Sequence, residues 1–201
     1  MRTIIKALVA VSLTAISVGC ATVQLPNNVS TVPVKSGSNY GYIDKIDFSY
    51  QPTQQKTFTQ LKLCIAENVS NDAISLHDSS GSFVGQATGN YYQSSNSQTI
   101  QGGDIFKYAE ETTATLIAKG TTDGGATAMG LTRDIIKFEL KGVSSNNSIT
   151  LVFSNIVRAQ QNTGNTVNSG FSPVGVWPGS NSNQVYDSIQ AIANKIKFCL
   201  N

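Results

Sequence analysis

The sequence is poor in the side chains on which catalytic and metal sites usually depend. Its 201 residues include one His, three Cys and one Trp, and only 13% are Asp, Glu, Lys or Arg. That charged fraction is about half of what soluble domains usually carry. A single imidazole and sparse carboxylates disfavour an enzyme. We therefore expect neither a metal nor any other cofactor.

A strong charge of either sign is also missing. The chain has 14 basic and 12 acidic residues, and two of the basic ones, Arg2 and Lys6, stand at the N-terminus. The remainder is thus formally neutral and shows no basic patch, so we expect no nucleic-acid partner. The mean hydropathy of −0.08 gives no sign of the apolar excess that a carrier with a lined cavity would need.

The apolar stretch near the N-terminus is too short to cross a membrane. Residues 7–19 carry no charge, but a membrane-spanning helix needs about 20 apolar residues. A basic N-terminal region, a short apolar region and small residues at the cleavage site are typical of a secretory signal peptide.

The end of this stretch, Ser17-Val18-Gly19-Cys20, resembles the lipobox of bacterial lipoproteins, with Ser17 where Leu is more usual. The resemblance covers residues 1–20. It implies removal of residues 1–19, lipid on Cys20, and attachment to a membrane through more than one acyl chain. Ala21, in place of Asp, favours the outer membrane of a diderm host, on its periplasmic face or at the cell surface. The alternatives are ordinary secretion with a chance Cys and a cytoplasmic protein with an apolar first helix.

The two other cysteines, Cys64 and Cys199, form an even pair. An exported protein folds in an oxidising compartment, which favours a disulfide between them. Two buried free thiols are the alternative.

The rest of the chain divides into a tether and one domain. Residues 20–39 carry two prolines and no periodicity, which predicts a lipidated N-terminus followed by a flexible tether. Residues 40–201 are long enough for a single domain with its own core.

Apolar residues alternate with polar ones along much of this domain, and alternation of period two indicates strands covered on one face. The predicted elements are a strand at 42–50, a strand (or a helix) at 58–69, a hairpin of 73–76 with 82–85, a long polar loop around a brief strand at 88–104, strands at 105–109 and 113–119, a loop at 121–127, and a hairpin of 134–143 with 148–159.

The last segment, residues 183–200, has helical spacing. Val185, Ile189, Ile192, Ile196 and Cys199 recur every three or four residues, which predicts an amphipathic helix lying on the sheet. Ser182 is the expected N-cap. The fold class is therefore α+β: an antiparallel sheet of roughly five to seven strands covered by a C-terminal helix.

No cluster in the sequence predicts catalysis. His77 is followed by Asp78, Ser79 and Ser80, but a Ser–His–Asp triad needs these groups to converge in space, and neighbours in sequence point apart. Gly102-Gly103-Asp104-Ile105-Phe106 resembles the GGDEF signature of diguanylate cyclases, yet Ile105 stands where that family needs an acid.

Carboxylate pairs are the other catalytic candidate. Glu110 and Glu111 adjoin at a predicted turn, and Glu67 with Asp47 could serve a hydrolase acting on envelope glycans only if the fold brought them together.

Three aromatic residues are candidates for binding a partner. Trp177 lies in a Pro/Gly-rich loop, and Tyr91 and Tyr92 lie in the polar stretch. Exposed Trp and Tyr are effective recognition anchors, here for an envelope protein or a glycan, although Trp177 could instead plug an edge of the core.

The sequence thus favours a membrane-anchored, non-catalytic lipoprotein with a binding or envelope-assembly role. A periplasmic carrier of a small ligand or lipid is the second hypothesis, and a hydrolase is the third.

Overall fold

The computed structural model describes residues 23–127, 132–145 and 148–201. The expected signal peptide, Cys20 and Ala21 lie outside these residues. Two helices and eleven strands are present in the described chain: β1 (Val29–Pro33), β2 (Gly41–Tyr50), α1 (Phe58–Asn68), β3 (Ile74–Asp78), β4 (Phe83–Val84), β5 (Tyr91–Tyr92), β6 (Asn96–Ile100), β7 (Phe106–Glu110), β8 (Thr115–Thr127), β9 (Thr132–Ser145), β10 (Ser148–Gln160), β11 (Ser172–Pro173) and α2 (Ser182–Leu200).

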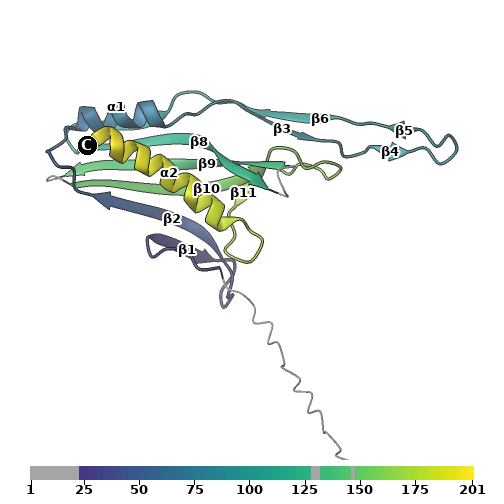
Figure 1. Ribbon diagram of the computed structural model, residues 1–201, viewed down its shortest axis with the longest axis horizontal. Coiled ribbons are helices and arrows are strands. Elements are labelled where there is room, and N and C mark those ends of the chain that lie inside the picture. The colour runs from purple at the N-terminus through teal and green to yellow at the C-terminus, as the bar shows by residue number, and fades with distance from the viewer. Residues whose placement is uncertain (1–22, 128–131, 146–147) are drawn as a thin grey trace, which may run out of the picture.

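A seven-stranded antiparallel sheet forms the body of the protein. Its order is β1-β2-β10-β9-β8-β7, and β11 pairs with β10 beyond the end of β2. Helix α2 runs across the sheet, and α1 lies beside the end of α2 (Figure 1). The predicted α+β class, the number of strands in the sheet and the covering helix are confirmed.

The hairpin of β9 and β10 lies at the centre of the sheet. The predicted hairpin is present, and its pairing extends beyond the predicted arm to Ser145, which lies opposite Ser148. The apolar side chains of the first arm, Ile136, Phe138 and Leu140, are buried under the helices, whereas Lys137 between them is not. One face of the sheet is thus covered, and the other is wet.

Helix α2 follows the predicted stripe with two corrections. Val185, Ile189, Ile192 and Ile196 are buried, but the stripe ends on Leu200, and Cys199 stands at its exposed margin. The N-cap is Asn181, in the left-handed conformation with φ of 59° and no side-chain cap bond. Ser182 is already helical, and its hydroxyl accepts a hydrogen bond from Ser180.

Residues 58–68 are a helix, so the preferred strand prediction for this segment is wrong and its alternative is correct. The buried side chains are Leu61, Cys64 and Ile65, a spacing of three and four, while Leu63 is 57% exposed. The apparent alternation of Leu61, Leu63 and Ile65 therefore does not reflect burial. Thr57 and Gln60 form a capping box that starts the helix.

The expected tether is partly built into the sheet. Residues 29–33 form β1 and pair with β2, with Val29 opposite Ile46. Leu25 and Val29 also pack against the core. The folded part therefore begins well before Tyr40, because Leu25 and Val29 pack against the core and β1 pairs with β2 as the edge strand of the sheet.

Residues 74–100 form a two-stranded arm that projects from the body (Figure 1). β3 pairs with β6, and β4 pairs with β5. The predicted hairpin of 73–76 with 82–85 is therefore wrong. The stretch 88–104 holds two short strands, β5 and β6, where one brief strand within a loop was predicted. The turn at Asp78–Gly81 is a bend within one side of the arm, and the chain reverses at Gly85–Asn90. The expected loop at 121–127 is likewise wrong, because β8 continues through it with a bulge.

Candidate functional site

The end of the arm carries a cluster of four large apolar side chains, Phe83, Val84, Tyr91 and Tyr92, which we call the arm tip. Phe83 lies opposite Tyr92, and Val84 lies opposite Tyr91. The rings of Phe83 and Tyr92 stack with centroids 5.0 Å apart and planes inclined by 16°. All four side chains are between 45% and 60% exposed. Burying such a patch against a partner would be favourable, because large exposed apolar groups gain most on leaving water.

Beyond Asp78 the arm is also uncharged. Residues 79–103 contain no Asp, Glu, Lys, Arg or His and are rich in Ser, Asn, Gln and Gly. Natural two-stranded edges usually carry charges that prevent pairing with other chains. The tip strands β4 and β5 lie at the far end of the arm, away from the sheet (Figure 1). The apolar tip is thus presented far from the core on a stalk that does not repel a partner electrostatically.

The base of the arm is fixed to the body. Ile74 and Leu76 are buried with Ala159, and Ile100, Ile135 and Phe171 pack around them. This small core holds the first half of the arm against β9, β10 and the loop that follows β10.

Asp78 reinforces the same junction through hydrogen bonds. Its Oδ1 accepts from the hydroxyl and the backbone N–H of Ser80 and from Asn96 Nδ2, and its Oδ2 accepts from the N–H of Asn168 at 3.0 Å. These bonds, led by that of the Ser80 hydroxyl and followed by that of the Asn168 N–H, hold the pKa of the Asp78 carboxyl well below its usual range. Asp78 therefore acts as a structural acceptor.

Trp177 belongs to a second cluster, together with Tyr40 and Tyr42. Its ring meets that of Tyr40 edge-on at 6.1 Å and that of Tyr42 at 5.7 Å. Trp177 is half-buried, so it neither fills the main core nor stands free in solvent. We call these three residues the Trp177 cluster.

Backbone hydrogen bonds bring the Trp177 cluster together. The N–H of Ile43 donates to the carbonyl of Val174, and the N–H of Val176 donates to that of Gly41. Gly175 is needed between them, because a Cβ atom there would lie 2.1 Å from Cη2 of Trp177. The Trp ring therefore rests directly on the backbone of residue 175.

An open hollow of about 590 Å³ lies against this cluster. Its lining is mostly aromatic and aliphatic, with one cation, and consists of Val34, Lys35, Ser38, Tyr40, Tyr42, Trp177 and Pro178. Trp177 also lines a neighbouring hollow of about 310 Å³ together with Val23 and the N-terminal end of α2. The start of the described chain thus lies beside Trp177.

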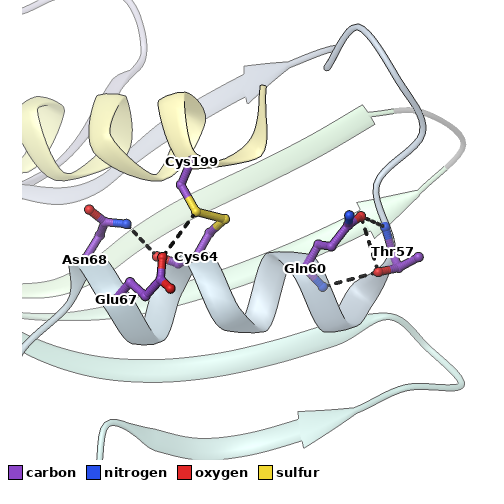
Figure 2. The surroundings of a disulfide bond; sticks show 6 residues. All are labelled: Thr57, Gln60, Cys64, Glu67, Asn68 and Cys199. Carbon is purple, nitrogen blue, oxygen red and sulfur yellow. Dashed lines mark hydrogen bonds between the residues drawn. A yellow bond between two sulfur atoms is a disulfide. The ribbon is translucent and has the colours of Figure 1, made fainter.

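The predicted disulfide between Cys64 and Cys199 is present (Figure 2). It joins α1 to the last turn of α2 and closes a sequence separation of 135 residues. Glu67 Oε2 lies 3.6 Å from the Cys199 sulfur, but a disulfide sulfur has no proton to donate. The bond leaves neither thiol free to act as a nucleophile.

The structure does not bring the other sequence candidates together into a catalytic arrangement. His77 is exposed, and its neighbour Asp78 points to the other face of β3 and binds Ser80 and Asn168. Gly102 and Gly103 lie in the irregular segment before β7, where Gly103 exchanges hydrogen bonds with Asn71. Within the described residues, no group of three or more His, Cys, Asp or Glu side chains is placed so that it could hold a metal ion.

The carboxylate pairs also stay apart. Glu110 accepts hydrogen bonds from the hydroxyls of Tyr108 and Thr113, which lower its pKa, whereas Glu111 is exposed. Glu67, on α1, lies beside Cys199 of α2, whereas Asp47 lies on β2 next to Asn28.

Sequence reasoning found Tyr91, Tyr92 and Trp177 but missed their neighbours. Phe83 and Val84 had a readable signal, because with Tyr91 and Tyr92 they are the large apolar residues of the uncharged stretch 79–99. No sequence signal marked Tyr40 and Tyr42, since their contact with Trp177 depends on pairing between segments 135 residues or more apart in the chain.

Comparisons with known proteins assign no family to this chain. No helix among the described residues is long and apolar enough to pass through a bilayer. No family model and no curated protein matches the chain significantly. A crystal structure of a DUF4468 family protein from Bacteroides ovatus is similar over 79% of this chain and 80% of that one, with 7% identity and a TM-score of 0.37.

Proposed function

We propose that this protein is a bacterial lipoprotein, anchored through lipid on Cys20 to the outer membrane, which binds an envelope protein through the arm tip without catalysing a reaction. The observation that carries the binding role is the exposure of Phe83, Val84, Tyr91 and Tyr92 at the end of an uncharged projecting arm.

The anchor is supported by the N-terminal sequence. Arg2 and Lys6 precede an apolar stretch that ends in Gly19-Cys20, and this order of regions is that of a secretory signal. The disulfide between Cys64 and Cys199 is in keeping with folding in an oxidising compartment.

The chemistry of the tip suits a protein partner better than a glycan. Sugar rings need an aromatic face open to stack against, whereas Phe83 and Tyr92 cover one face of each other. The remaining exposed surface is aliphatic and aromatic, and aromatic side chains that enter an apolar pocket dominate the binding energy of protein interfaces.

Site-specific photo-cross-linking in intact cells tests this proposal. A photoreactive amino acid replaces Tyr91 at the tip, and in a matched protein it replaces Phe198, which is 85% exposed on α2. We expect the tip probe to give one discrete cross-linked envelope protein that the Phe198 probe does not give.

A tip substitution shows whether the captured protein binds the tip. With the probe at Tyr91, Val84→Ser should abolish the cross-link, because Val84 lies opposite residue 91; Tyr108→Ser, at an exposed position of β7, should not. Equal cross-linking from positions 91 and 198, or a cross-link that survives Val84→Ser, would rule out binding through the tip.

A further inference from the structure

The Trp177 cluster lies close to the point where the lipid anchor would join the domain. Val23 and Trp177 line the same hollow. Cys20 precedes Val23 by three residues, and three residues of extended chain reach at most about 11 Å. A lipidated Cys20 would therefore hold Trp177 within reach of the membrane surface.

The side chains around Trp177 have the character of a membrane interface. Val32, Val34 and Tyr40, on the hairpin of β1 and β2, are 45%, 43% and 57% exposed. Val32 pairs with Tyr42, and Val34 hydrogen-bonds to Tyr40 across the hairpin, so their side chains share one face. Trp and Tyr favour the boundary between headgroups and acyl chains, where an apolar ring and a polar group can both be satisfied.

One cation completes this face. Lys35 lies in the turn of the same hairpin and lines the hollow with Tyr40 and Trp177. A Lys beside an apolar patch can lay its aliphatic stem on that patch and direct its ammonium group towards anionic headgroups.

We propose that the Trp177 cluster, with Val32, Val34 and Lys35, is a membrane-docking face that rests on the lipid bilayer to which Cys20 is anchored. This inference rests on the anchoring part of the proposed function. Docking would fix the orientation of the domain on the membrane through the β1 edge of the sheet. The arm projects past the end of the sheet, and its tip lies far from β1 (Figure 1).

Trp177 is the only Trp of the chain and therefore reports on this face directly. The full lipidated protein is reconstituted into vesicles of phosphatidylethanolamine and phosphatidylglycerol that contain brominated acyl chains, which quench nearby Trp emission. A matched protein carries Trp177→Tyr with Tyr91→Trp, which moves the reporter to the arm tip.

We expect bromine near the headgroup to quench Trp177 about two-fold or more relative to the reporter at position 91, because interfacial aromatic rings sit at that depth. The emission of Trp177 should also shift to shorter wavelength on reconstitution. Quenching of the Trp177 protein that is no stronger than that of the Tyr91→Trp protein would overturn the proposal.

Flotation of the vesicles separates this inference from the anchor itself. A chain that floats with the vesicles but leaves Trp177 unquenched refutes the docking face and leaves the anchor standing. A chain that is neither lipidated nor recovered with the vesicles refutes the anchor, and the docking face falls with it.

Discussion

Asp78 ties the base of the arm to the body of the protein through both carboxylate oxygens. Because these bonds lower its pKa, the ionised form stabilises the folded junction. That stabilisation is complete above the ordinary carboxyl value of 3.8 and is lost as the pH falls below it. The arm base should therefore loosen in acid while remaining ordered at neutral pH.

We predict that Asp78→Asn loosens the same junction at neutral pH, since the amide cannot accept at both ends of its side chain. Hydrogen exchange should become faster at the N–H groups of Ser80 and Asn168, with the exposed Asp72→Asn as control. Unchanged protection of both amides would show that Asp78 does not hold the arm.

Gly175 makes room for the Trp177 ring. We predict that Gly175→Ala displaces the ring, because the added Cβ would lie 2.1 Å from Cη2. The emission of Trp177 should move to longer wavelength, and the free energy of unfolding should fall by about 1–3 kcal/mol, as in other overpacked sites. The exposed Ser97→Ala is the control, and an unaltered spectrum of the Gly175→Ala protein would contradict the packing described.

Individual residues were readable from sequence where chemistry alone fixes the role. The pairing of Cys64 with Cys199 followed from an even count and an oxidising compartment. The environment of Trp177 did not follow, because it depends on residues 174–176 bonding to residues 41–43, a contact between distant parts of the chain.

Helices α1 and α2 are joined by the disulfide at one end of the sheet. We predict that Cys64→Ala with Cys199→Ala lowers the free energy of unfolding by about 2–5 kcal/mol, because the open chain regains the entropy of a long loop. Denaturation in urea measures the loss.

The folded structure should survive the loss of this bond, because Leu61, Ile65 and Ile196 remain buried in the core. Wild-type protein treated with dithiothreitol should lose the same amount of stability, and the double variant should not respond to the reagent. Equal stability of the wild type and the double variant would show that packing alone holds the helices together.

Some elements were predicted correctly from their sequence pattern, and others were misread. The hairpin of β9 and β10 and the helix α2 carry their periodicity within one segment. Helix α1 was misread because Leu63, although exposed, completes an alternating pattern. The arm was misread because β3 pairs with β6 across some twenty residues, so no short turn marks the pairing.

The whole molecule exposes two separate apolar surfaces, the Trp177 cluster and the arm tip. The Trp177 cluster belongs to the β1 and β2 edge, whereas the arm projects past the end of the sheet and its tip lies far from β1 (Figure 1). A membrane could therefore bind the Trp177 cluster while a protein partner binds the arm tip, because the two surfaces do not overlap. This division of surfaces depends on one covalent event, the attachment of lipid to Cys20.

Mass spectrometry of the N-terminus tests that event most directly. The protein is extracted from the membrane fraction of the cells that make it, beside a Cys20→Ala variant. We predict that the mature chain begins at Cys20 and carries acyl groups there, and that the variant keeps residues 1–19 or leaves the membrane fraction. A wild-type chain that begins elsewhere, or at an unmodified Cys20, would contradict the anchor and the membrane orientation derived from it.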